Sequence, residues 1–208
     1  MLRLVMKVWC LEFKEKNMNN ENKLLEYDEV CPYSEGRAAV RKGEFWGYVD
    51  ENGKLVSTDF TRSGKPGFPY NYAEPFCDGW AKVHDKVGQD DHCYLIDRNC
   101  NPMMVDGEYI SSGDTMRNGV SIVGFDCFED YRECLVDKDC HVLSDRFEEI
   151  SYIGKKGISY SDFGIYAIVR NGYKYGLLNV KSFKLELPCE YGWTDFWEEI
   201  ERLGISFE

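Results

Sequence analysis

The sequence predicts an all-β protein, an array of about four antiparallel β-meander repeats followed by a short C-terminal capping helix. One motif recurs four times at spacings of about 40 residues, which is typical of a repeat architecture. Apolar and polar residues alternate inside each copy, as they do in half-buried strands. The aromatic content of 15% also favours strands, because flat rings fit a pleated surface.

The four copies share two marker positions. A glycine precedes the first predicted strand at Gly36, Gly79, Gly119 and Gly164. A polar residue closes the second predicted strand at Asp50, Asp97, Asp137 and Asn179. Each copy therefore resembles a three-stranded antiparallel meander. Because a single hairpin cannot bury its apolar face, neighbouring copies must stack, either as an open array or as a closed barrel or propeller.

The turn after the second strand carries the strongest hairpin signal. Asn52 and Gly53 both tolerate positive φ, so we expect a tight turn with positive φ at both residues. The second and third copies have Asn99-Cys100 and Asp139-Cys140 at this place. Cysteine is poorly suited to positive φ, so these turns are predicted to be strained or of another type.

These patterns divide the chain into an N-terminal cap segment, a repeat array and a C-terminal region. The predicted bounds are 1–30 for the cap, 31–69, 70–110, 111–157 and 158–190 for the repeats, and 191–208 for the helix and tail. Apolar residues from Trp193 to Leu203 have helical spacing, with Thr194 or Asp195 as the N-cap and Gly204 as the terminator. We expect this helix to cover the exposed edge of the last repeat.

The first copy contains Trp46-Gly47 followed by Asp50-Glu51-Asn52-Gly53. This pattern resembles the WG-repeat family of bacterial proteins over roughly residues 27–190. The later copies replace the Trp-Gly pair by Cys93-Tyr94, Glu133-Cys134 and Tyr175-Gly176. The resemblance implies an all-β interaction module without a shared catalytic residue. The residues expected to carry the structural motif are Gly36, Trp46, Gly47, Tyr48, Asp50, Gly53, Gly79, Asp97, Gly119, Asp137, Gly164 and Gly176.

Charge and cysteine usage restrict the classes of partner. The net charge of −12 repels phosphate backbones, so direct nucleic-acid binding is not expected, whereas a basic protein partner or an acidic mimic of nucleic acid is allowed. No apolar stretch approaches the ~20 residues of a membrane helix, and Met1–Cys10 does not resemble a secretory signal. The nine cysteines include no Cys-x-x-Cys pair, which favours reduced thiols and a cytoplasmic location.

The segment between the strands of the second copy has the only metal-ligand composition. It contains His84, Asp91, His92 and Cys93. A metal site needs three or four ligands in fixed geometry, and a polar loop does not provide this by itself, so we expect neither a metal nor another cofactor. No nucleophile elbow or phosphate-binding loop is present, and we expect no catalytic residue.

Aromatic residues are the better functional candidates. Trp46 is expected in the core, whereas loop aromatics are more exposed, and loops on a rigid array often bind ligands. The candidates are Phe68, Tyr70, Tyr72, Phe128 and Tyr131. We expect a non-catalytic protein-binding or scaffold module, in a narrower form a defence-associated or toxin-neutralising partner. The alternatives are glycan or small-ligand binding through exposed aromatics and, third, an enzyme whose site is assembled across repeats.

Overall fold

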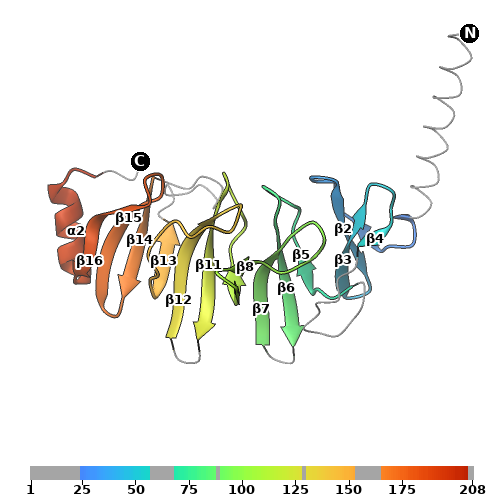
Figure 1. Ribbon diagram of the computed structural model, residues 1–208, viewed down its shortest axis with the longest axis horizontal. Coiled ribbons are helices and arrows are strands. Elements are labelled where there is room, and N and C mark those ends of the chain that lie inside the picture. The colour runs from blue at the N-terminus through green and yellow to red at the C-terminus, as the bar shows by residue number, and fades with distance from the viewer. Residues whose placement is uncertain (1–23, 57–67, 88–89, 128–129, 153–164, 206–208) are drawn as a thin grey trace, which may run out of the picture. The chain divides into compact units, whose positions relative to one another are not determined.

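The computed structural model describes residues 24–56, 68–87, 90–127, 130–152 and 165–205. They belong to two compact units (Figure 1). The first comprises Met1–Met103 and Thr115–Arg117, and the second Met104–Asp114 and Asn118–Glu208. Each unit contains two repeats. The all-β architecture is confirmed: the described residues form antiparallel sheets and a short C-terminal helix.

The first unit contains the first two repeats. Its strands are β1 (Glu29–Val30), β2 (Arg37–Lys42), β3 (Phe45–Asp50), β4 (Leu55–Val56), β5 (Tyr72–Ala73), β6 (Ala81–Val87) and β7 (Asp90–Ile96). In the first repeat the strands pair in the order β1-β2-β3-β4. In the second, β5 pairs with β6 and β6 with β7.

The second unit contains the last two repeats and the helix. Its elements are β8 (Met104–Val105), β9 (Glu108–Tyr109), β10 (Ser112–Gly113), β11 (Val120–Cys127), β12 (Asp130–Asp137), β13 (Glu149–Tyr152), β14 (Tyr166–Asn171), β15 (Lys174–Asn179), β16 (Lys184–Tyr191) and α2 (Trp193–Arg202). β10, β11 and β12 pair in sequence, and so do β13 to β16. β8 and β9 form a separate hairpin.

The first and fourth repeats each contain one more strand than the predicted meander. The lead-in segment forms a short edge strand, β1, β5, β10 or β13, which pairs antiparallel with the first long strand. The predicted third strand is β4 in the first repeat and β16 in the fourth. In the second repeat the predicted third strand, Met103–Val105, forms β8, which pairs with β9, and only Pro102 bridges to Ile96. In the third repeat only the single pair Val136 with Val142 is formed.

The marker glycines occupy tight turns before the first long strand. Glu35-Gly36 and Asp78-Gly79 have positive φ at both residues, from 51° to 91°. Reciprocal backbone hydrogen bonds close each turn, between Ser34 and Arg37 in the first case. These are features of type I′ turns, which only glycine and a few polar residues adopt readily. Asn118-Gly119 has the same φ pattern, and Gly164 lies outside the described residues.

The marker acids organise the turn after the second long strand. Asp50 Oδ1 accepts hydrogen bonds from the backbone N–H groups of Asn52 and Lys54, both at 2.9 Å. The same two acceptor bonds recur at Asp97 and Asp137, and Asn179 Oδ1 accepts from two backbone N–H groups of its own turn. Each side chain thus replaces bonds that the backbone cannot make in the turn.

The prediction of positive φ at both Asn52 and Gly53 is wrong, because only Gly53 has it (φ 67°). Its equivalents Cys100 (φ 63°) and Cys140 (φ 67°) also have left-handed backbones. The cysteine turns are therefore strained versions of the same turn. A non-glycine residue in this region costs roughly 1–2 kcal/mol, which the paired acceptor bonds of the preceding aspartate help to offset.

Several strands are buried on both faces over part of their length, so simple alternation does not describe them, whereas β14 keeps an alternating pattern. Three consecutive residues are buried in β2 (Ala38–Val40), β3 (Gly47–Val49) and β12 (Cys134–Val136). In the first repeat one face contributes Val40 and Val49 to an apolar cluster. On the other face the ring of Tyr48 contacts those of Tyr70 and Phe76, with centroids 6.2 and 5.0 Å apart. Two-sided burial produces continuous apolar runs.

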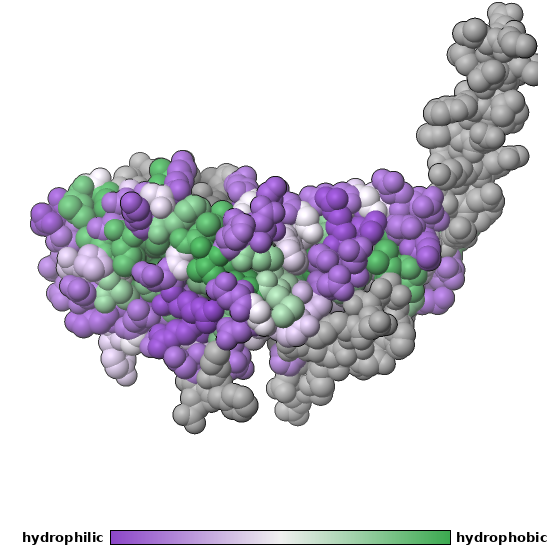
Figure 2. All heavy atoms as spheres, viewed as in Figure 1, coloured by the Kyte–Doolittle hydropathy of each residue, from purple (hydrophilic) through white to green (hydrophobic). Residues whose placement is uncertain are grey.

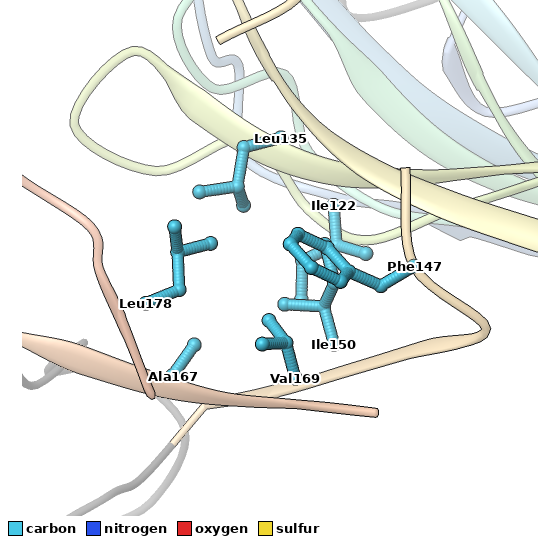
Figure 3. Packing of buried hydrophobic residues seen from close by; sticks show 7 residues of the cluster. All are labelled: Ile122, Leu135, Phe147, Ile150, Ala167, Val169 and Leu178. Atoms are coloured by element: carbon cyan, nitrogen blue, oxygen red, sulfur yellow. The ribbon is translucent and has the colours of Figure 1, made fainter. Parts of the chain in front are cut away.

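The third and fourth repeats pack through such a core (Figure 3). Ala167, Val169 and Leu178 project from β14 and β15. They meet Ile122 and Leu135 of the preceding repeat, and the cluster also contains Phe147 and Ile150 of the lead-in segment of the fourth repeat. Burial of each large aliphatic side chain contributes about 1.5–3 kcal/mol.

Helix α2 covers the opposite face of the fourth repeat (Figure 1). Phe196 and Ile200 of α2 pack on Leu177 of β15 and Leu187 of β16. Leu177 matches Leu135, which contacts the next repeat in the third copy, so α2 takes the place of a fifth repeat. The predicted edge-covering role is wrong because the helix lies on the sheet face.

The helix ends as predicted but begins differently. The N-cap is Gly192, and no side chain caps it, so neither Thr194 nor Asp195 has the predicted role. At the C-terminus Gly204 has φ 65°, and the Ile205 N–H donates to the Ile200 carbonyl at 3.2 Å. This is the Schellman arrangement, in which glycine accepts the left-handed conformation.

We predict that Phe196→Ala will lower the free energy of unfolding by about 3–5 kcal/mol, because the buried ring joins α2 to the sheet. Leu203→Ala is the matched control, since this apolar side chain at the end of the same helix is exposed; we expect a change below about 1 kcal/mol. Urea denaturation measures both. Equal losses would contradict a capping role for α2.

The glycine of the Trp-Gly position is under a close packing constraint in the fourth repeat. A Cβ at Gly176 would lie 2.8 Å from the Leu187 carbonyl oxygen and 2.9 Å from the Cys189 nitrogen. Both are backbone atoms of β16 that cannot move alone. We predict that Gly176→Ala will cost about 1–3 kcal/mol in urea denaturation. Gly192→Ala should be nearly neutral, because its Cβ would meet only Asp195 Oδ2 at 3.4 Å. A neutral Gly176→Ala would show that β16 can shift.

The aspartate of the second turn gives a further prediction. Asp97→Ala removes the acceptor for the Asn99 and Asn101 N–H groups, so we expect a loss of about 0.5–2 kcal/mol, as for other lost side-chain caps. Asp97→Asn keeps an acceptor oxygen, as Asn179 does in the fourth repeat, and should cost less than half as much. Thermal unfolding compares the two variants; equal losses would point to the charge instead of the acceptor.

Candidate functional site

The Trp-Gly position is where the next repeat attaches. The Trp46 N–H donates to the Tyr70 carbonyl at 2.7 Å, and the Tyr70 N–H donates back to Trp46 at 3.2 Å. In the third repeat Glu133 and Phe147 exchange the same two bonds, at 2.7 and 2.8 Å. In the fourth, Tyr191 of β16 is the register partner of Tyr175. An aromatic residue thus occupies the attachment point in all three.

This attachment places an exposed ring beside the Trp-Gly position. Tyr72 lies two residues after Tyr70, and its side chain is 48% exposed. Its ring meets the Trp46 ring edge-on, with centroids 6.4 Å apart, and its centroid lies 5.5 Å from that of the His84 ring. The Arg41 guanidinium lies 6.0 Å from the Trp46 ring centroid. We call Trp46 and Tyr72 the first aromatic pair.

The fourth repeat contains a matching arrangement, the second aromatic pair. Trp193 lies two residues after Tyr191, and its side chain is 52% exposed. Its ring meets Tyr175 edge-on, with centroids 4.8 Å apart at an interplanar angle of 64°. Tyr175 occupies the place that Trp46 has in the first repeat. The same position in two repeats therefore presents a half-exposed ring against a strand aromatic.

In the third repeat carboxylates replace the rings. Glu133 stands at the Trp46 position, and its Oε1 accepts a hydrogen bond from Tyr131 at 2.9 Å. Its Oε2 accepts from the Ile150 N–H at 2.6 Å. Burial raises the pKa of Glu133, and the nearby Glu149 carboxylate adds to the shift. Tyr131 is also bonded to Ser112 at 2.6 Å, so the cluster is an internally bonded polar network.

The predicted binding aromatics fall into different environments. Tyr72 and Tyr131 are exposed, as expected of binding residues. Tyr70 is buried, so its assignment as an exposed loop residue is wrong; its backbone joins the repeats and its ring packs on Tyr48. Phe68 is half-buried against the core cluster of the first repeat. Phe128 lies outside the described residues.

The predicted metal candidates lie on strands, not in a loop. His84 in β6 and Cys93 in β7 are directly opposite each other, and His92 faces Asp85 in the register. Neighbouring residues on a strand point to opposite faces, so His92 and Cys93 diverge. The side chain of Asp91 lies outside the described residues. Among the side chains that are described, no three potential ligands gather as a metal site would require.

Thiols are poor candidates for nucleophilic chemistry. Seven cysteines whose side chains are described form no disulfide: Cys31, Cys77, Cys93, Cys100, Cys134, Cys140 and Cys189. Burial raises the pKa of Cys100 to about 12 and that of Cys134 to about 11. Both are therefore almost fully protonated at neutral pH, and the thiol form is a weak nucleophile.

Sequence reasoning missed two members of the aromatic pairs. Trp46 was expected in the core but is only half-buried, and Trp193 was read solely as part of a capping helix. A signal was available in each case. Trp46 and Tyr175 align in the repeats, and an aromatic residue follows the attachment point at the same offset, at Tyr72 and at Trp193.

Comparison with known families gives one match. The sequence model of the family described as WG containing repeat matches residues 23–44. No curated protein matches the chain. None of the helices in the described part of the chain is both long and apolar enough to cross a membrane.

Proposed function

We propose that this chain, a WG-repeat protein, is a non-catalytic protein-binding or scaffold module of the cytoplasm. The observation that carries the proposal is the recurrence of a half-exposed aromatic ring at equivalent positions, Tyr72 in the first unit and Trp193 in the second. Each ring is held edge-on by a strand aromatic. Tyrosine and tryptophan presented in this way are common anchors of protein interfaces.

The rigidity of these rings favours binding. Tyr72 lies in β5, between Trp46 and His84, so little side-chain freedom remains to be lost on association. Aromatic side chains provide large contact area at a low entropic cost because they have only two rotatable side-chain bonds. The net charge of −12 directs the module toward basic or neutral partners and away from nucleic acids. A defence-associated or toxin-neutralising role is the narrower form of this proposal.

Glycan or small-ligand binding is the second candidate function. The first aromatic pair supports it, because the Tyr72 and Trp46 rings lie beside the polar groups of Arg41 and His84. Aromatic faces with a few adjacent polar groups are typical of small-ligand sites. Catalysis at a site assembled across repeats is the third candidate function, and we propose no catalytic residue for it.

Affinity capture from the native cytosol tests the proposal with three proteins: wild type, Tyr72→Ala and Tyr109→Ala. Tyr109 is a matched control, because its side chain is 50% exposed and lies in the β8–β9 hairpin. We expect wild type and Tyr109→Ala to retain a specific protein that Tyr72→Ala binds at least tenfold more weakly, as for an interface hot spot. Saccharide-dependent quenching of tryptophan fluorescence without any captured protein would instead support the second candidate function.

A further inference from the structure

We propose that the second aromatic pair, Tyr175 and Trp193, binds a lysine- or arginine-rich segment of a partner protein. This inference rests on the proposed protein-binding function and deepens it, because it assigns a surface and the chemistry of the segment that the surface recognises. It concerns residues of the second unit alone.

The Trp193 ring is fixed and open. Tyr175 supports it at 4.8 Å and Trp197 at 5.5 Å, both edge-on, while Phe196 stacks at 6.3 Å. Despite these three contacts, half of the side chain remains exposed. Figure 2 shows hydrophobic and hydrophilic residues side by side on one face of the described residues. A ligand would therefore meet an ordered aromatic surface.

The segment that contains Trp193 is acidic. The chain has five acidic residues and one basic residue between Glu190 and Arg202. The basic residue, Arg202, is bonded to Glu199 through both Nε and Nη2. The other four acidic residues have no ion pair with any described side chain: Glu190, Asp195, Glu198 and Glu201. Trp193 therefore belongs to a segment that has a net charge of −4, from five acidic residues and one basic residue.

An exposed ring and unpaired carboxylates favour the same occupant. The face of tryptophan attracts an ammonium or guanidinium group, and nearby carboxylates strengthen that attraction. The first repeat provides an internal example, because Arg41 already lies over Trp46 at 6.0 Å. Among the described residues no cation lies over Trp193. The equivalent arginine of the fourth repeat, Arg170, is the register partner of Tyr175 and is bonded to Glu148 and Glu149. The exposed part of the Trp193 ring is therefore available to an external cation.

The peptide acetyl-tetraarginine-amide is a direct probe, and acetyl-tetracitrulline-amide is its neutral isostere. Tryptophan indole resonances in ¹⁵N-labelled protein report which of the five Trp residues responds. We expect tetraarginine to shift the Trp193 resonance saturably and tetracitrulline to have no effect. Equal shifts with both peptides, or shifts that leave Trp193 unmoved, would overturn the proposal.

Variants distinguish binding at Trp193 from attraction by the overall negative charge of the chain. We expect Trp193→Leu to weaken tetraarginine binding about three- to fivefold, and Trp193→Phe to weaken it less because a ring remains. For Trp193→Leu, whose indole is absent, calorimetry measures the affinity. Glu198→Gln should also weaken binding, whereas Glu44→Gln, an equal charge change in the β2–β3 turn, should not. Equal effects of the two glutamine variants would show non-specific attraction and overturn the assignment.

Unchanged urea midpoints verify that the variants are folded. The two proposals fail separately. A chain that captures its partner through Tyr72 but does not bind tetraarginine at Trp193 overturns this inference and leaves the proposed function intact. A chain that binds the peptide but captures no protein partner contradicts the proposed function, and with it the assignment of a protein segment as the occupant.

Discussion

The fold depends on one repeated interaction, the reciprocal pair of backbone hydrogen bonds at the Trp-Gly position. Trp46 exchanges these bonds with Tyr70, and Glu133 exchanges them with Phe147. Because the bonds involve only backbone atoms, they persist when the side chain changes from tryptophan to glutamate. These bonds fix the point at which the next repeat begins. They therefore also determine which residue of that repeat lies beside the strand of the preceding one. Tyr72 lies against Trp46 for this reason. Packing and candidate site thus have a common origin.

Stacking buries a face of one repeat against its neighbour, which leaves an apolar face to be covered in the last repeat. Leu135 packs on the following repeat, whereas its equivalent Leu177 has none to pack on. An uncovered apolar face would promote association between chains. Helix α2 covers this face with Phe196 and Ile200. The helix also brings Trp193 to Tyr175, so the element that terminates the array creates the second aromatic pair.

The same scaffold positions carry different chemistry in different repeats. In the first pair a cation, Arg41, lies over the Trp46 ring, whereas the second pair includes Trp193 of an acidic segment, and the third repeat has Glu133 in a bonded polar network. A constant backbone with variable side chains is how repeat proteins diversify their binding surfaces. The turn residues recur in most repeats of this chain, whereas the residues beside the attachment point differ between repeats. This difference fits that division of roles.

The sequence by itself determined the repeats, their strands and their turn residues, because these depend on local chemistry. Gly36 and Asp50 are recognisable from the backbone geometry that their turns require. Only the tertiary structure decided which aromatics are exposed. Tyr70 is buried and Tyr72 is not, although both lie in one short segment, because the bonds to Trp46 turn one ring into the core. In strands that are buried on both faces, such as β2 and β3, an alternation of apolar and polar residues does not mark the core either. Exposure depends on the neighbouring repeat, which no local pattern contains.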